Sequence, residues 1–435
     1  MIAGIFLLLL LLASPARAAD APSVIRDEEI EQALKTMCTP VFRQAGVSPQ
    51  SVKFILIEDN ELNAFVAGGQ NIFIHTGLLL STENPEEITG VVAHETGHIA
   101  LGHLLRLQEE MKNMSFESIL ANILGIATVI ATGRADAGMA VSAAGQNVAM
   151  SSLLSHSRTQ EGSADAAGVK FLRGAQLPMT GLLSFMEKLK GQELLPETEQ
   201  SQYIRTHPLT QDRIDFLENA AAQKYPSVVP KEWYTLHKRL KAKLLGFLFP
   251  VRALQDRSDT TEARYGRAIA YYRQGKLDKS LALLDPLIAQ EPANPYFYEL
   301  KGQMLLEYGH VADSLPAYAQ AARYAPDSGL IRTAYGHALL EEGRTQEAVK
   351  QFTLSLRNED RAPDTHHFLA VAYGRLGDEG QSRLHLAEEA LLQNNLDYAQ
   401  TEASLALKKL PSHSPNWLRA QDILDFTART LKKKH

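Results

Sequence analysis

Two histidines, His94 and His98, stand four residues apart in the stretch His94-Glu95-Thr96-Gly97-His98. Side chains at positions i and i+4 project from one face of a helix, so both imidazoles can reach a single metal ion. Glu95 is rotated by about 100° from His94 around such a helix, which places it near the ion but not on it. There it can take a proton from a water molecule that the ion activates. The pattern predicts a zinc-dependent hydrolase in which His94 and His98 are metal ligands and Glu95 is the general base.

A catalytic zinc ion has three protein ligands and keeps one position for water, so a third ligand is required. Six residues after His98, where some zinc proteases have a further histidine, the residue is Leu104. His103 is one residue too early and is interpreted as a histidine on the helix surface. Glu161 and Asp165 lie four residues apart on a second predicted helix. We expect Glu161 to be the third ligand and Asp165 to accept the remaining N–H of a ligand histidine.

The elements around these residues can also be predicted. Asn84 is a favourable N-cap, the following proline suits the first helical position, and Glu87 can complete a capping box. A helix carrying both histidines is therefore expected to begin there. Upstream, residues 52–57 are typical of a strand, and residues 63–66 and 71–75 are typical of a hairpin around Gly68-Gly69.

From about residue 260 the sequence repeats with a period of 34 residues. Glycines that would end a helix and begin a turn recur at this spacing, at Gly275, Gly309, Gly343 and Gly377. Small residues that allow close helix packing recur in a second register, at Ala268, Gly302, Gly336 and Ala370. Four copies in phase indicate tetratricopeptide repeats, whose stacked helix pairs form a concave surface for peptides or proteins. The phase is lost after residue 385, so residues 386–430 are expected to form atypical closing helices.

Together, the sequences HETGH at 94–98 and EGSAD at 161–165 resemble the HtpX-like and CAAX-prenyl-protease-like zinc endopeptidases. The segment Asn63-Ala64-Phe65-Val66 resembles the stretch that precedes the metal helix in that family. Thr206-His207-Pro208-Leu209 with Arg213-Ile214 resembles a later family element. The resemblance implies an α+β fold: a mainly helical, gluzincin-like catalytic domain with a small β-sheet, followed here by an all-α tetratricopeptide-repeat solenoid. It also implies peptide-bond hydrolysis with one Zn²⁺ ion per chain.

The resemblance further implies that His207 acts at the zinc ion, and two roles remain open. His207 could stabilise the oxyanion, as could Arg213, or it could bind zinc as a fourth ligand and block the water position. Asn63, Ala64 and Phe65 are expected to bind substrate, because the hairpin could offer a free edge that a substrate strand joins. The alternative is that the hairpin only completes a small sheet.

The N-terminus predicts export. Residues 2–12 form an unbroken apolar run that is too short to span a membrane, and Ala16-Arg17-Ala18 suits a signal peptidase. We therefore expect a signal peptide at 1–18, a zinc metallopeptidase domain at 19–254 and a repeat domain at 255–435, with an uncleaved anchor as the alternative. An exported chain with one cysteine and hence no internal disulfide fits a bacterial periplasm. The uncharged run at 119–132 is also too short to span a membrane.

Charge and composition limit the possible partners. Lys and Arg total 44 against 50 Asp and Glu, a net charge of −6, which disfavours nucleic-acid binding. The basic and apolar stretch at 237–249 is interpreted as a connecting helix, with peripheral membrane contact as the alternative.

Three classes of function follow from these observations. Taken with the export signal and the repeats, the resemblance implies a periplasmic protease that cleaves misfolded or stalled proteins and assists outer-membrane β-barrel assembly. Expected partners are unfolded or misassembled outer-membrane proteins and, through the repeats, the β-barrel assembly machinery. The alternative is mainly a chaperone or assembly factor whose protease is silenced by His207. A pure interaction scaffold is disfavoured because the set His94, Glu95, His98 and Glu161 is complete.

Overall fold

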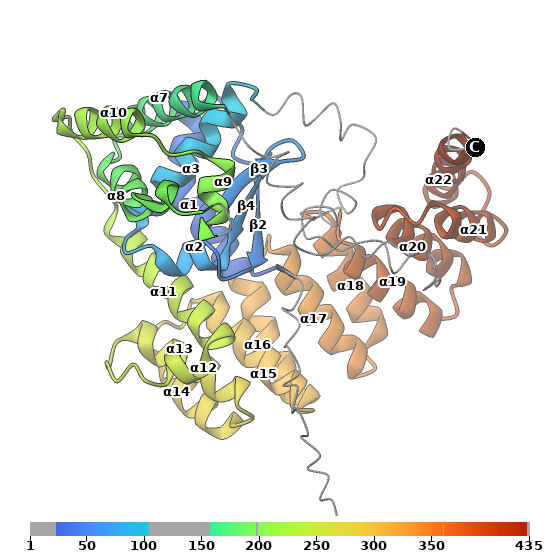
Figure 1. Cartoon of the computed structure of the whole chain (residues 1–435). Coiled ribbons are helices and arrows are strands. Elements are labelled where there is room, and N and C mark those ends of the chain that lie inside the picture. The colour runs from blue at the N-terminus through green and yellow to red at the C-terminus, as the bar shows by residue number, and fades with distance from the viewer. Residues whose placement is uncertain (1–22, 104–156, 197–198, 360, 433–435) are drawn as a thin grey trace, which may run out of the picture.

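The computed structural model describes residues 23–103, 157–196, 199–359 and 361–432 (Figure 1). The predicted signal peptide and the uncharged run at 119–132 lie outside these ranges. The described part begins with a small sheet and the helices around it, and it continues into a long array of helix pairs (Figure 1). Within the described ranges, no helix is both long enough and apolar enough to cross a membrane.

The sheet has four strands in the order β1-β2-β4-β3. Strand β2 pairs antiparallel with β1 and parallel with β4, and β3 pairs antiparallel with β4. The bounds are β1 (Ser23–Ile25), β2 (Lys53–Glu58), β3 (Ala64–Ala67) and β4 (Asn71–His75). The predicted strand and hairpin are thus confirmed, and β3 lies at one edge of the sheet. Phe65 of β3 stacks on Phe73 of β4 with ring centroids 5.0 Å apart.

Helices α1 and α3 pack on each other, and both also contact the sheet. Cys38 of α1 is fully buried in the core that these elements share, and burial raises the pKa of its thiol. The helices of this N-terminal unit are α1 (Glu28–Gln44), α2 (Thr76–Ser81), α3 (Pro85–Ala100), α7 (Arg158–Gly174), α8 (Thr180–Leu189), the short 3₁₀ helix η1 (Gln192–Leu194), α9 (Gln202–Thr206) and α10 (Gln211–Ala222).

Helix α3 begins where the sequence predicts, but its cap differs in one bond. The side chain of Asn84 accepts a hydrogen bond from the Glu87 N–H at 3.0 Å, as expected of an N-cap. The reciprocal capping-box bond is absent, because the Glu87 carboxylate instead accepts from the Glu83 N–H at 2.9 Å. The same carboxylate pairs with Lys188 of α8 at 2.7 Å, so a tertiary contact displaces the local one.

Close approach fixes α3 against both of its neighbouring helices. A Cβ atom added to Gly90 would lie 2.5 Å from the backbone nitrogen of Leu182 in α8, and one added to Gly97 would lie 2.7 Å from the backbone oxygen of Ala164 in α7. Only glycine fits at these two positions. The metal helix is therefore held in place on two sides by backbone contact.

The connecting segment is the helix α11 (Lys231–Leu248), followed by α12 (Pro250–Ala253). One face of α11 is buried, with Trp233, His237 and Leu240 at most 5% exposed. Lys243 from this face pairs with Asp27 at 2.8 Å and with Glu29 at 3.2 Å, both at the start of α1. The connecting-helix interpretation therefore accounts for the apolar face of this segment.

The repeat unit consists of helix pairs whose turns follow the predicted glycine register. Gly275, Gly309, Gly343 and Gly377 have φ values of 77°, 81°, 82° and 77°, a left-handed conformation that favours glycine. The helices are α13 (Thr261–Arg273), α14 (Leu277–Gln290), α15 (Pro295–Glu307), α16 (Val311–Tyr324), α17 (Gly329–Glu341), α18 (Thr345–Leu356), α19 (Pro363–Arg375), α20 (Glu379–Leu392), α21 (Leu396–Leu407) and α22 (Pro415–Lys432).

The loss of phase has a simple structural cause. Helices α15, α17 and α19 begin 34 residues apart, at 295, 329 and 363, because the longer connection at 357–362 follows a shorter helix α18. The connection at 393–395 has only three residues, and α21 begins 33 residues after α19, at 396. Asn394, with φ of 56°, takes the left-handed position in this shorter turn. The predicted start of the closing helices at residue 386 falls inside α20, so the regular array extends further than the sequence pattern indicates.

The two units are in direct contact. The hydroxyl of Tyr265 in α13 donates to Glu29 of α1 at 2.8 Å in a buried hydrogen bond. Arg26 pairs with Glu359, which follows α18, at 2.6 Å. Figure 1 shows the repeats passing beneath the sheet before they turn away toward the C-terminus.

Candidate metal centre

Four buried side chains from three helices meet at one point of the N-terminal unit. His94 and His98 come from α3, Glu161 from the first turn of α7, and His207 from the residue that ends α9. One ligand atom from each lies within 4.8 Å of the others. The sequence prediction had grouped the first three as ligands, and the structure brings all four together.

Asp165 orients His94. Its Oδ1 lies 2.8 Å from Nδ1 of His94, while Arg213 donates to Oδ1 from Nη2 at 2.9 Å and to Oδ2 from Nε at 2.6 Å. Burial alone would raise the pKa of Asp165, but the hydrogen bonds from His94 and Arg213 lower it below its ordinary value. An ionised Asp165 requires His94 to carry its proton on Nδ1, so the lone pair on Nε2 faces the cluster.

Glu161 lies among the three imidazoles. Its carboxylate oxygens lie 3.4 Å from Nε2 of His94, 3.4 Å from Nε2 of His98 and 3.1 Å from Nδ1 of His207. Although burial opposes ionisation, His207 and His94 hold the pKa of Glu161 well below its usual range. An anionic oxygen and several imidazole nitrogens in a buried space are the donor set of a transition-metal site.

Glu95 borders the cluster but does not belong to it. The side chain is fully buried, and neither carboxylate oxygen accepts a hydrogen bond from the described residues. Oε1 lies 3.5 Å from Nε2 of His207. Burial raises the pKa of Glu95 above its ordinary value. A buried carboxylate with free acceptor capacity beside a candidate metal site is suited to accept a proton.

His207 is held more firmly than its sequence suggests. The Thr-His-Pro sequence predicts a loop that can move, yet His207 is 1% exposed. Its N–H donates to the carbonyl of Tyr203 at 2.7 Å, and its ring stacks on the Tyr203 ring at a centroid distance of 4.6 Å. Nδ1 lies 3.4 Å from Nε2 of His94, so the ring occupies a position at the cluster.

Arg213 occupies a different position from the one expected of an oxyanion donor. Besides its bonds to Asp165, Nη1 lies 2.8 Å from Glu161 Oε2 and also donates to the Pro208 carbonyl at 2.8 Å. The guanidinium is thus committed to two carboxylates and a backbone oxygen. These contacts favour a role in positioning the two carboxylates, and the expected role of Arg213 at the oxyanion stays a prediction.

The predicted substrate-binding residues Asn63, Ala64 and Phe65 have buried side chains. All three are at most 3% exposed, and β3 packs on α3. The backbone carbonyl of Asn63 accepts from the His75 N–H at 3.0 Å, and the side-chain amide of Asn63 donates to the Gln202 side chain at 3.1 Å. The other edge of β3 pairs with no strand in the described ranges.

His103, which the sequence analysis interprets as a histidine on the helix surface, lies against His98 instead. Its Nδ1 lies 3.0 Å from Nδ1 of His98, on the side of that ring away from the cluster. The chain turns back at Gly102, whose φ is 68°, and this turn folds His103 against the helix it has just left. A glycine near the end of a helix often marks the turn that terminates it. Gly102 therefore indicates that His103 lies beyond the helix and not on its surface.

Comparison with known proteins agrees with this organisation. Residues 25–221 match the model of peptidase family M48, and residues 251–304 and 300–364 match tetratricopeptide-repeat models. The chain therefore comprises a peptidase family M48 domain followed by tetratricopeptide repeats, and it is a metalloprotease with the α+β and all-α architecture predicted from its sequence.

Two of the similar proteins match most of this chain, and a third matches about half of it. The chain is 25% identical over 402 residues to the β-barrel assembly-enhancing protease of Yersinia pestis, covering 88% of this chain and 79% of that protein. It is 25% identical over 391 residues to the protein of the same name in Escherichia coli (strain K12), covering 86% and 78%. The metalloprotease LoiP of Escherichia coli (strain K12) is 25% identical over 206 residues, covering 47% of this chain and 74% of that protein.

Proposed function

We propose that this chain is a zinc endopeptidase whose ion is held by His94, His98 and Glu161. The observation that carries this proposal is the spacing of the donors. A tetrahedron with ligand bonds of about 2.0–2.1 Å has edges of roughly 3.3–3.4 Å. The separations of 3.1 Å between the Nε2 atoms of His94 and His98 and 3.4 Å from each to Glu161 are close to these edges.

In this proposal a bound zinc ion would polarise the scissile carbonyl and lower the pKa of the attacking water toward about 7. The residues of the chain do the rest. Glu95 takes the proton of the water and later passes it to the leaving amine. Asp165 and Arg213 hold His94 and Glu161 in place, and His103 accepts the Nδ1–H of His98.

Substrate binding is proposed at the free edge of β3. Its strand partner β4 uses one edge, and the opposite edge can pair with an extended substrate strand through backbone hydrogen bonds. Ala64 and Phe65 are at most 3% exposed with their main-chain atoms included, so a substrate strand would have to displace the atoms that cover this edge before it pairs.

His207 supports a second candidate function. A fourth protein ligand closes a zinc site and excludes the water that catalysis needs. The position of His207 within the donor cluster favours this silencing role over that of an oxyanion donor. A protein in this closed state would act as a chaperone or assembly factor, and displacement of His207 would release the protease.

We further propose a periplasmic protein with a signal peptide at 1–18, a protease domain at 19–254 and a repeat domain at 255–435. The relatives are named for β-barrel assembly. By analogy, the proposed substrates are misfolded or stalled outer-membrane β-barrel proteins, which the repeats recruit together with the assembly machinery. Peripheral contact with the membrane remains part of this proposal.

The decisive experiment is Glu95→Gln. We expect the variant to fold and to retain zinc, but to lose at least about 10²-fold of its casein-cleaving activity, the usual contribution of a general base. Zinc content is measured on the same preparations. Glu86→Gln, on the first turn of the same helix, is the matched control and should cleave like wild type.

Equal activity of Glu95→Gln and wild type would refute the mechanism. Absence of zinc from wild-type protein purified without chelators, with retained activity, would refute the metal assignment.

A further inference from the structure

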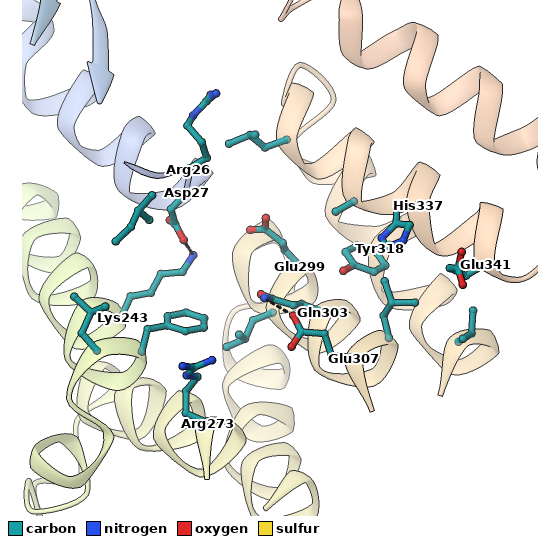
Figure 2. Close-up of a pocket in the computed structure, with 18 of the residues that line it drawn as sticks. Arg26, Asp27, Lys243, Arg273, Glu299, Gln303, Glu307, Tyr318, His337 and Glu341 are labelled. Carbon is teal, nitrogen blue, oxygen red and sulfur yellow. Dashed lines mark hydrogen bonds and ion pairs between the residues drawn. The ribbon is translucent and has the colours of Figure 1, made fainter. Parts of the chain in front are cut away.

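A cavity lies where the repeats meet the N-terminal unit. Its volume is about 940 Å³, within the range of about 300–1,000 Å³ that is usual for ligand sites. It is lined by β1 and the start of α1, by α11, and by repeat helices including α15, α16 and α17, and no residue of the metal centre is among its lining residues (Figure 2).

Acidic side chains form one wall of this cavity. Glu299, Gln303 and Glu307 lie four residues apart on α15, so they share one face of the helix, and this face lines the cavity. Gln303 donates to Glu307 at 2.9 Å, and the Tyr272 hydroxyl donates to the same carboxylate. Within the described ranges, no lysine or arginine lies at ion-pair distance from Glu299 or Glu307.

Two of the three cations that line the cavity are already paired, and the third, Arg273, has no ion pair in the described ranges. Arg26 pairs with Glu31 at 2.8 Å and with Glu359 at 2.6 Å, and neither of these lines the cavity. Lys243 already serves two carboxylates, Asp27 and Glu29. The lining as a whole has five carboxylates and three cations: Asp27, Glu58, Glu299, Glu307 and Glu341 against Arg26, Lys243 and Arg273. Acidic groups therefore outnumber basic groups in the lining, and Glu299 and Glu307 face the cavity without an ion pair in the described ranges.

Tyr318 contributes a hydroxyl to the cavity that is available to a ligand. This side chain is only 2% exposed, and its hydroxyl makes no hydrogen bond with the described residues. Figure 2 shows the hydroxyl directed into the cavity toward α15. Because the hydroxyl oxygen is accessible from the cavity, a bound ligand can form a hydrogen bond with it in place of water. Burial and the neighbouring carboxylates also raise the pKa of Glu299, although Lys243 opposes this.

The remaining wall is apolar. Phe247 of α11, Leu300 and Leu306 of α15, and Leu330 of α17 line the same space. Lysine and arginine have apolar stems that lie along such surfaces while their charged ends meet carboxylates. A small hydrophilic cation would use only the acidic wall, whereas a peptide with basic and apolar residues would use both.

We propose that this cavity binds a lysine or arginine side chain, with its apolar neighbours, of an unfolded polypeptide. The proposal rests on the protease function argued above, for which it supplies a substrate-holding site separate from the metal centre. Glu299 and Glu307 pair with the basic group, Tyr318 donates to or accepts from the bound segment, and the α11 and α17 side chains contact its apolar residues.

The test measures binding of a fluorescent peptide that alternates Lys with Leu to full-length Glu95→Gln protein, which should not cleave it. Because binding is read without catalysis, its outcome is independent of the mechanism proposed for Glu95. We expect the double change Glu299→Gln and Glu307→Gln to weaken binding by at least about tenfold. Glu342→Gln, an exposed carboxylate next to the cavity residue Glu341, should leave binding unchanged.

Two further comparisons complete the experiment. Tyr318→Phe, which removes one hydroxyl and serves if the double variant does not fold, should weaken binding at least about twofold. A peptide with Glu in place of Lys should not bind. Unchanged binding in the folded double variant would overturn the proposal. If the double variant does not fold, unchanged binding in Tyr318→Phe would overturn it. So would equal binding of the acidic peptide, or spermidine competing as strongly as the basic peptide.

Discussion

His207 is the fourth side chain of the donor cluster, and the proposed silencing role would put its ring at the coordination position that a hydrolytic zinc site keeps for water. Its ring is fixed by stacking on Tyr203 and by the backbone hydrogen bond to the same residue. If the ring fills this position, His207→Ala should retain zinc on three ligands and cleave peptides faster than wild type, because the position is opened.

Peptide cleavage and zinc content of His207→Ala are compared with wild type and with His310→Ala. His310 is exposed on the repeats and should behave as wild type. Lower activity of His207→Ala with zinc retained would instead assign His207 to the oxyanion and eliminate the silencing role.

His103 offers a test of the support behind a ligand. If it accepts the Nδ1–H of His98, His103→Ala should weaken zinc binding by roughly 10- to 100-fold, as is usual for such partners. Competition with a chelator measures this loss directly. His103→Gln keeps an acceptor oxygen and should recover part of the affinity, and indistinguishable affinities for wild type and His103→Ala would remove His103 from the site.

The candidate site could be predicted from the sequence as far as local spacing reaches. The i and i+4 pairs predicted His94 with His98 and Glu161 with Asp165, because helical geometry alone puts each pair on one face. The contacts of Arg213 and His103 could not be predicted in this way, because their partners are set by tertiary packing. Arg213 meets carboxylates on α7, and His103 is turned back by Gly102.

Between elements, the close approach of α3 and α7 at Gly97 brings the ligands of the two helices together. Gly97→Ala would place its Cβ 2.7 Å from the Ala164 carbonyl oxygen, so the helices must separate. We expect a loss of roughly 1–3 kcal/mol in unfolding free energy together with weaker zinc binding. Urea unfolding and chelator competition measure the two effects.

Gly162→Ala is the matched control on α7. Its added Cβ would meet no atom within 4 Å, so the change should stabilise the helix by about 0.5–1 kcal/mol. Gly97→Ala with wild-type stability and zinc affinity would contradict the packing argument.

The elements themselves were largely predictable, since caps, glycine turns and the 34-residue period are local signals. Two details were not. The Glu87 carboxylate gives up its expected capping bond for Lys188 of another helix, and the three-residue connection at 393–395 shifts the last repeats out of phase. The first depends on a partner from another helix and the second on the length of a connection, and helix propensity predicts neither.

At the scale of the whole molecule, the repeats are fastened to the N-terminal unit by a buried polar contact. Tyr265→Phe removes the hydroxyl that donates to Glu29, both being at most 2% exposed. We expect a loss of about 1–3 kcal/mol in unfolding free energy, because the buried carboxylate loses a hydrogen bond. Tyr298→Phe removes an exposed bond to Pro292 and should cost less than about 0.5 kcal/mol.

Chemical denaturation distinguishes the units when two signals are monitored. Zinc release reports unfolding of the N-terminal unit, and loss of helix content reports mainly unfolding of the repeats. Tyr265→Phe should lower both transitions, because the contact couples them. A change confined to the repeats would mean that the two units unfold independently.

Cys38, the single cysteine, is fully enclosed in the core around α1. A thiol reacts as the thiolate and only when a reagent reaches it, so the folded chain resists oxidation and cannot cross-link to a second copy. Each unfolded molecule, by contrast, exposes one reactive sulfur. The extent of Cys38 alkylation therefore measures the fraction of molecules in which this core has opened. In an oxidising compartment, disulfide-linked dimers would form only from molecules that have unfolded.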